Sequence, residues 1–253
     1  MAYQKPLNGV VRQLNPSITI LSVPFTRLHI LEIGGRSTFI TLPSKSLAII
    51  APVPYDESSA SIVGDFPVKW LIAPDFEHHM ALKSWKEKYP DAKVIGVTGL
   101  RARKASQGVA VDYEVSLPSK VITPLEAGID DPELNEVFKF VYAPQHPNKE
   151  LVTYHEPTKT LIEADLLFNL PALEQYSKSQ VSNKGGFTRI FNSMHPGSWL
   201  HAKMVGGMKG KPGGIEAIKA VDSLDFETLI PCHGEVIESD AKEKFKKTFA
   251  AFF

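Results

Sequence analysis

The chain has 253 residues, of which 28 are Lys or Arg and 28 are Asp or Glu, so its formal net charge is zero. Hydrophobic residues make up 43% and charged residues 22%, which is typical of a soluble globular protein and excludes a fibrous repeat or a largely disordered chain. The lack of a basic excess also argues against nucleic acid as a partner.

Neither the cysteine content nor the apolar segments indicate a secreted or membrane protein. The single cysteine, Cys232, excludes an internal disulfide and a Cys-rich zinc module. The first apolar stretch, residues 18–23, runs into Pro24 and Arg27, so it is too short for a signal peptide. No segment has the roughly 18–20 apolar residues that span a bilayer. We therefore expect a cytoplasmic protein that binds no membrane and forms one domain over residues 1–253.

The first third of the sequence predicts short strands and then a β-α-β unit. Four segments rich in β-branched residues and bounded by Pro or Gly predict antiparallel strands: residues 18–23, 28–33, 37–41 and 47–50. Another strand, residues 68–73, ends at Pro74. Helical spacing of apolar residues follows from Phe76 to Tyr89, with Asp75 as the N-terminal cap. This helix leads to a strand over residues 93–97.

The second half predicts strands, two helices and a long loop. Residues 99–134 show no regular pattern. Strand signals return at residues 137–142, 150–154, 160–163 and 228–230, and helical patterns at 215–221 and 240–252. Residues 176–214 are rich in Ser, Asn, Lys and Gly, which predicts a long mobile loop or lid.

Several histidines and one aspartate follow predicted strands. They are His78 and His79 after residues 68–73, His146 after 137–142, Asp165 after 160–163 and His233 after 228–230. In a layered α/β protein the carboxyl ends of the strands meet at one rim, where sites form. Imidazoles with a carboxylate are the ligands expected for zinc or a similar divalent ion. The sequence therefore predicts a metal site built from these five residues.

These motifs resemble, in order and spacing, those of the metallo-β-lactamase superfamily. The family's first motif is His-x-His-x-Asp-His; residues 74–79 here read Pro-Asp-Phe-Glu-His-His, so only the last histidine, His79, is kept. The family's lone loop histidine corresponds to His146, its bridging aspartate to Asp165, and the histidine of Pro-x-His-Gly to His233. The resemblance covers roughly residues 18–240. It implies an α/β fold, a four-layer αββα sandwich with the metal site on the sheet rim.

The departure at residues 74–78 implies one metal ion instead of two. Pro74 and Phe76 replace two histidines that hold the family's first metal, so that site should be lost. The resemblance leaves His78, His79, Asp165 and His233 for the second metal, with His146 as a further ligand or an acid/base group. Asp165 and His146 are then the expected catalytic residues, since an imidazole titrates near pH 6.5. Zinc is the expected ion, with iron or manganese as alternatives.

The expected function is hydrolysis of a small ester, lactone or thioester by a metal-activated water. Two alternatives stay open: a non-catalytic metal-binding or interaction protein with the same fold, and an iron-dependent oxidoreductase. His78 and His79 can equally be helix-start histidines without a metal. The predicted lid also contains candidates for holding an anionic substrate, for which a solvated loop is the favoured interpretation: Lys184, His195, His201 and Lys203. The identity of the substrate and the oligomeric state stay open.

Overall fold

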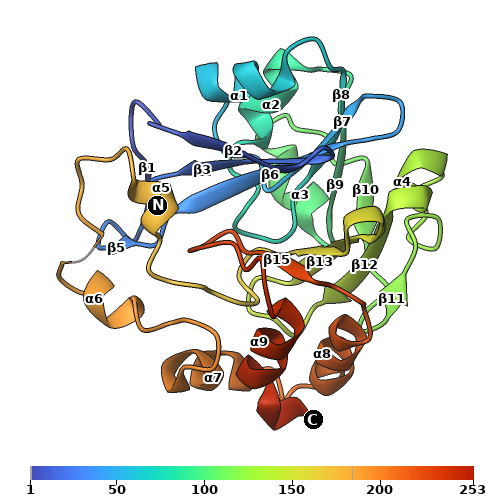
Figure 1. Cartoon of the computed structure of the whole chain (residues 1–253). Coiled ribbons are helices and arrows are strands. Elements are labelled where there is room, and N and C mark those ends of the chain that lie inside the picture. Colours follow the sequence, from blue (N-terminus) through green and yellow to red (C-terminus); the bar gives the residue numbers. More distant parts are fainter. Residues whose placement is uncertain (1, 184) are drawn as a thin grey trace.

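The computed structural model describes residues 2–183 and 185–253. Two facing sheets form its centre, and helices cover their outer sides (Figure 1). No helix in these two ranges is long and apolar enough to cross a bilayer.

The larger sheet has seven strands in the order β10-β9-β8-β7-β6-β3-β2. Its strands are β2 (Val10–Asn15), β3 (Ile18–Val23), β6 (Gly35–Thr41), β7 (Leu47–Ile50), β8 (Val68–Ile72), β9 (Lys93–Val97) and β10 (Tyr113–Val115). The half from β2 to β7 is antiparallel, whereas β7, β8, β9 and β10 run parallel. The parallel strands therefore bring their carboxyl ends to the same edge of the sheet.

The second sheet has five strands in chain order. They are β11 (Val121–Ile122), β12 (Phe138–Ala143), β13 (Glu150–His155), β14 (Thr160–Ile162) and β15 (Thr228–Ile230). The last two pair in parallel, so the segments that follow them leave in the same direction. A small third sheet consists of β1 (Ala2–Tyr3), β4 (Phe25–Arg27) and β5 (Leu31–Glu32).

Short helices complete the chain. They are α1 (Glu57–Val63), α2 (Leu82–Lys88), α3 (Leu100–Ala105), α4 (Pro132–Val137), α5 (Leu173–Tyr176), α6 (Thr188–Phe191), α7 (Trp199–Gly206), α8 (Gly214–Asp222) and α9 (Ala241–Thr248), with 3-10 turns at Glu156–Thr158 and Ala250–Phe252. In Figure 1, α1 and α2 lie on the side of the larger sheet, and α8 and α9 on the side of the smaller one.

Three buried apolar clusters separate the layers. Trp70 and Phe140 belong to the cluster between the two sheets. Trp85 of α2 and Phe39 belong to a cluster on the outer face of the seven-stranded sheet. Phe245 of α9 belongs to a cluster on the outer face of the five-stranded sheet. This layering confirms the predicted four-layer αββα sandwich.

Three local predictions differ from the structure. The predicted strand at 28–33 is a hairpin, because Leu28 and His29 adopt positive φ angles of 53° and 61° and turn the chain between β4 and β5. The predicted helix from Phe76 begins only at Leu82, and a series of turns precedes it. The predicted loop at 176–214 contains α6 and α7.

Candidate metal centre

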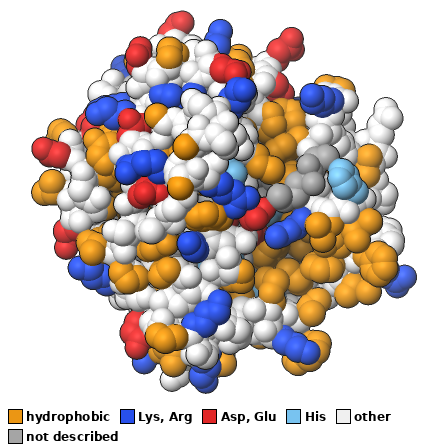
Figure 2. All heavy atoms as spheres, turned by 180° about the vertical axis from the view of Figure 1, so that it is seen from behind, with side chains coloured by type: hydrophobic (Ala, Val, Ile, Leu, Met, Phe, Trp, Pro, Cys, Tyr) orange, Lys and Arg blue, Asp and Glu red, His pale blue; other side chains and the backbone are white. Residues whose placement is uncertain are grey.

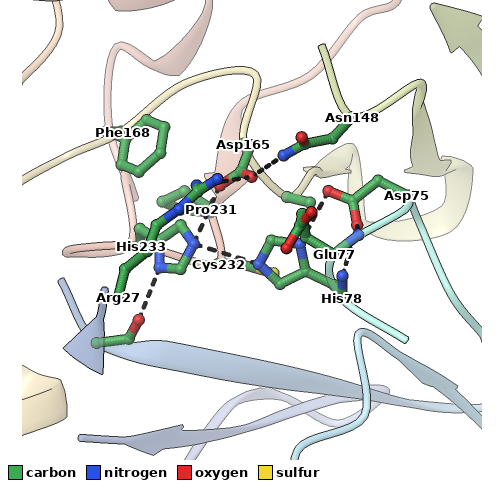
Figure 3. A network of polar contacts seen from close by, with 12 residues as sticks. Arg27, Asp75, Glu77, His78, Asn148, Asp165, Phe168, Pro231, Cys232 and His233 are labelled. Atoms are coloured by element: carbon green, nitrogen blue, oxygen red, sulfur yellow. Dashed lines mark hydrogen bonds and ion pairs between the residues drawn. The ribbon is translucent and has the colours of Figure 1, made fainter. Parts of the chain in front are cut away.

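Three side chains converge at the rim where the two sheets meet. His78 lies in the turns after β8, Asp165 follows β14, and His233 follows β15. One ligand atom from each lies within 4.8 Å of the other two. His233 Nε2 lies 3.0 Å from Asp165 Oδ1 and 3.2 Å from His78 Nε2 (Figure 3).

The outer nitrogen of each imidazole is held by an acceptor. His233 Nδ1 donates to the carbonyl oxygen of Gly34 at 2.7 Å, and His78 Nδ1 donates to the carboxylate of Asp75 at 2.9 Å. Because a carbonyl and a carboxylate only accept, each Nδ1 carries a proton, and Nε2 of each ring faces the centre of the site.

The three converging atoms therefore fit a cation. Asp165 Oδ1 is buried and has no hydrogen-bond partner among the described residues. With both Nδ1 atoms protonated, the two Nε2 atoms and this carboxylate oxygen repel one another unless a proton or a metal ion lies between them. Two imidazoles and one carboxylate are also a common ligand set of catalytic divalent metals. These residues can thus hold a metal ion.

The charges in the group are mutually dependent. Burial by itself would raise the pKa of the Asp165 carboxyl, but the His78 and His233 rings outweigh it and hold this pKa well below its ordinary value. Burial would lower the pKa of His78, whereas the carboxylates of Asp75 and Asp165 outweigh it and raise this pKa to about 9. The site therefore favours positive charge opposite Asp165.

A buried glutamate and an asparagine position Asp165. Glu150 is fully buried, and its carboxylate accepts the backbone N–H groups of Ala164 at 2.7 Å and Asp165 at 2.9 Å. The Asn148 amide donates to Asp165 Oδ2, and the Arg27 guanidinium lies 3.8 Å from the same oxygen. Asp165 Oδ1 is therefore left to face the two imidazoles.

The turn that carries His233 is clamped by Gln175. This fully buried amide accepts from Gly234 N at 2.9 Å and donates to the Cys232 carbonyl at 2.7 Å. Gly234 has φ +93°, and a Cβ there would lie 2.0 Å from the carbonyl oxygen of Asn169, so only glycine fits. Phe168 stacks on the His233 ring, with centroids 5.1 Å apart.

No protein-family model and no curated protein sequence matches the chain. Solved structures do. The metallo-β-lactamase from Hirschia baltica matches with a TM-score of 0.60 and 10% identity, over 96% of this chain and 97% of its own. The fold is that of the metallo-β-lactamases.

Flavo di-iron proteins share this fold. A variant of the one from Thermotoga maritima matches 97% of this chain with a TM-score of 0.63 and 14% identity. The Flv1 flavodiiron core from Synechocystis sp. PCC6803 matches 96% of this chain with a TM-score of 0.66 and 13% identity. The chain spans 62% and 60% of these two proteins, respectively. Identities this low show the fold alone.

His79, which the sequence analysis predicted as a ligand, is not in the group of three. It is buried, and neither ring nitrogen has a hydrogen-bond partner within the described part of the chain. Its burial, and then the charges of Lys104 and Arg103 on α3, lower its pKa to about 4. Adjacent residues in a turn point in different directions. Here His78, at the family's aspartate position, turns toward Asp165 instead.

His146 lies near the group without joining it. Its ring is buried, with Nδ1 3.6 Å from the Glu150 carboxylate. Together with Asp165 it lines a cavity of about 310 Å³, whose wall also includes Arg27, Asn148 and Lys211. The structure thus places His146 beside the site, facing the same cavity as Asp165.

Pro74 and Phe76, which the sequence analysis compared with two histidines of the family motif, offer no metal-ligating side chain. Pro74 offers only its carbonyl, which accepts from Leu151 N. The ring of Phe76 has Lys149 Nζ 4.7 Å from its centre. Residues 2–183 and 185–253 contain no second group of three metal-ligating side chains.

The candidates from the predicted lid do not gather at the site. Lys184 lies outside the described residues. His201 is buried, and its Nε2 accepts from Phe168 N at 3.2 Å. His195 is exposed, and Lys203 lies over the Trp199 ring at 5.1 Å.

Four contributors to the site were missed by sequence reasoning. Asp75 was assigned only a helix-capping role, and its carboxylate does accept from Glu77 N and His78 N. Asn148 could have been identified from its place in the same predicted loop as His146, two residues further on. Arg27 and Lys211 carry no local signal, because only the tertiary fold brings them to the cavity.

Proposed function

We propose that the protein is a metal-dependent hydrolase with a single divalent ion held by His78, Asp165 and His233. The observation that carries this proposal is the convergence of the buried Asp165 Oδ1 with the Nε2 atoms of His233, 3.0 Å away, and of His78. A divalent ion with these three ligands and an open position supplies a Lewis acid and lowers the pKa of a bound water toward about 7.

The cavity beside Asp165 supports a small-molecule substrate. Its volume of about 310 Å³ is near the lower end of the roughly 300–1,000 Å³ of small-molecule sites. His146 in its wall is placed to give a proton to a leaving oxygen or sulfur, or to take one from water. Asn148 brings an amide donor to the same wall, suited to a carbonyl oxygen that gains negative charge. Esters, lactones and thioesters share that change of charge.

The metal content of purified protein tests the proposal. We expect about one equivalent of zinc, which Asp165→Ala and His233→Ala both lose. His79→Leu is the matched control, because it removes a neighbouring buried imidazole that does not reach the group. It should keep the metal. Hydrolysis by the metal-loaded protein is then measured on esters, lactones and thioesters. Full metal content in both Asp165→Ala and His233→Ala would refute the site.

A second candidate, an iron-dependent oxidoreductase, is favoured by the ligand set itself. Two histidines and one carboxylate also bind non-haem Fe(II), and two structural neighbours are flavo di-iron proteins by name. Stoichiometric iron with oxygen consumption would support this candidate. Stoichiometric metal with neither activity would support a non-catalytic metal-binding protein.

A further inference from the structure

A second cavity adjoins the one over the metal centre. Its volume is about 250 Å³, and it shares Arg27, Phe168 and Met204 with the first cavity. Arg27 and Met204 are long and flexible, and Met204 is 42% exposed. Phe168 is buried and stacked on His233, so a bound molecule would connect the two cavities by displacing Arg27 and Met204.

The two cavities differ in chemistry. Seven of the eight residues that line the second are apolar. They come from the β4–β5 hairpin, the loop after β14, α6, α7 and the segment between these two helices. The first cavity contains the cations Arg27 and Lys211 beside Asp165 and His146. Lys211 Nζ donates to the Gln145 carbonyl at 2.7 Å, which uses one of its three N–H donors.

The sequence segment that carries α6 and α7 is basic, although the molecule is neutral overall. Between Glu174 and Glu216 the sequence contains no Asp or Glu and six basic residues: Lys178, Lys184, Arg189, Lys203, Lys209 and Lys211. Such segregation of charge attracts anions to this face. Figure 2 shows hydrophobic side chains gathered on the side formed by β5, α6 and α7, with Lys and Arg side chains around them.

We propose that the ligand of this joint cleft is an amphiphilic anion, with its carboxylate or phosphate on Arg27 and Lys211 and an unbranched apolar chain in the second cavity. That this ligand is a substrate rests on the proposed hydrolase function; the binding itself does not. A neutral ester would leave Lys211 without an anion and Arg27 with only its 3.8 Å contact to Asp165. A short polar anion would leave the apolar cavity unfilled. An amphiphile satisfies both.

Calorimetric titration of the full chain tests this proposal. It is done on protein treated with chelator and, separately, on protein loaded with zinc. The probes are hexanoate, octanoate, decanoate and decyl phosphate, below the concentrations at which they form micelles, with decanol as the uncharged control. We expect affinity to rise by up to about fourfold per methylene and decanol to bind at least tenfold more weakly than the better anion. The stronger of decanoate and decyl phosphate identifies the headgroup.

Two pairs of variants locate the ligand. Lys211→Met removes the cation, and Lys209→Met is its control on the same segment. Met204→Gln makes the shared wall polar, and Trp199→Gln is its control on α7, because Trp199 is 73% exposed and lines neither cavity. We expect the two cleft variants, Lys211→Met and Met204→Gln, each to weaken the binding of decanoate at least tenfold. Each control should weaken it less than twofold.

The outcomes separate this inference from the proposed function. Equal binding of decanol and decanoate, no dependence on chain length, or equal losses in the cleft variants and their controls would overturn the amphiphilic cleft. Probe binding to zinc-loaded protein that hydrolyses none of the esters, lactones and thioesters would refute the hydrolase and leave the cleft standing.

Discussion

At the scale of single residues, the contacts behind the ligands decide what the site can hold. Asp75 is fully buried, and it fixes both the backbone of the turn and the protonated nitrogen of His78. Outer carboxylates of this kind orient an imidazole and make it a better ligand.

Replacing Asp75 with Asn therefore weakens metal binding while keeping the shape of the side chain. The amide presents an N–H where His78 Nδ1 needs an acceptor, so the ring turns or changes tautomer. We expect the metal affinity to fall on the order of 10–100-fold, measured by competition with a chelating indicator. Asp112→Asn is the control, because Asp112 accepts from Val94 N away from the group. Equal losses in the two variants would indicate a general effect of charge.

His78 also shows what one sequence can and cannot predict at this scale. His146, Asp165 and His233 were expected at the site from their places after strands, and the structure brings all three to one rim. Sequence reasoning included both His78 and His79 but could not tell which would face Asp165. That choice depends on the turns between β8 and α2, and side-chain directions in a turn have no fixed period.

At the scale of elements, continuous β-branched runs gave the best predictions. The bounds predicted for β7, β9 and β15 agree with the structure, because strands buried on both faces read as short apolar runs between Gly, Pro or polar residues. The hairpin at 28–33 was missed because its turn uses Leu28 and His29 at positive φ, where glycine or asparagine is the usual signal.

The end of β13 makes stability depend on pH through His155. This imidazole is 1% exposed, with Nδ1 2.7 Å from Thr158 Oγ1 in the following 3-10 turn, and burial lowers its pKa to about 4. Between pH 6.5 and about 4 the unfolded chain binds a proton here that the folded chain does not. The stability that the buried, neutral His155 ring contributes is therefore complete above pH 6.5 and is lost as the pH falls toward 4.

His155→Gln should reduce this acid sensitivity. From the pKa of about 4 in the folded state and 6.5 in the unfolded state, His155 lowers the free energy of unfolding by about 2 kcal/mol as the pH falls from 7 to 5. Without this imidazole, the variant's free energy of unfolding should fall by about 2 kcal/mol less over the same interval. Urea unfolding at the two pH values measures this difference. The variant's stability at pH 7 serves as its own reference, so a general loss of packing does not affect the comparison. Identical losses in wild type and variant would show that His155 titrates normally in the folded state.

At the scale of the whole molecule, the candidate metal ligands join the two sheets. His78 comes from the seven-stranded sheet, whereas Asp165 and His233 come from the five-stranded sheet, so the group forms only when the sheets are packed together. The sandwich itself was predictable from a family resemblance in motif order. The amphiphilic cleft was not, because it is assembled from the hairpin, α6 and α7, whose sequences have little periodic pattern.

A metal that binds this interface should stabilise the fold as a whole. Binding to the folded state alone adds about 2.7 kcal/mol when free metal is at 100 times the dissociation constant. For a chain of this size that is roughly 5–10 °C in Tm. Thermal unfolding with chelator and with added zinc measures the shift. It should be absent in Asp165→Ala, which removes the ligand between the two imidazoles, and complete in His79→Leu. A full shift in Asp165→Ala would place the stabilising metal elsewhere on the surface, because a metal between the sheets cannot keep its affinity without the one carboxylate that faces it.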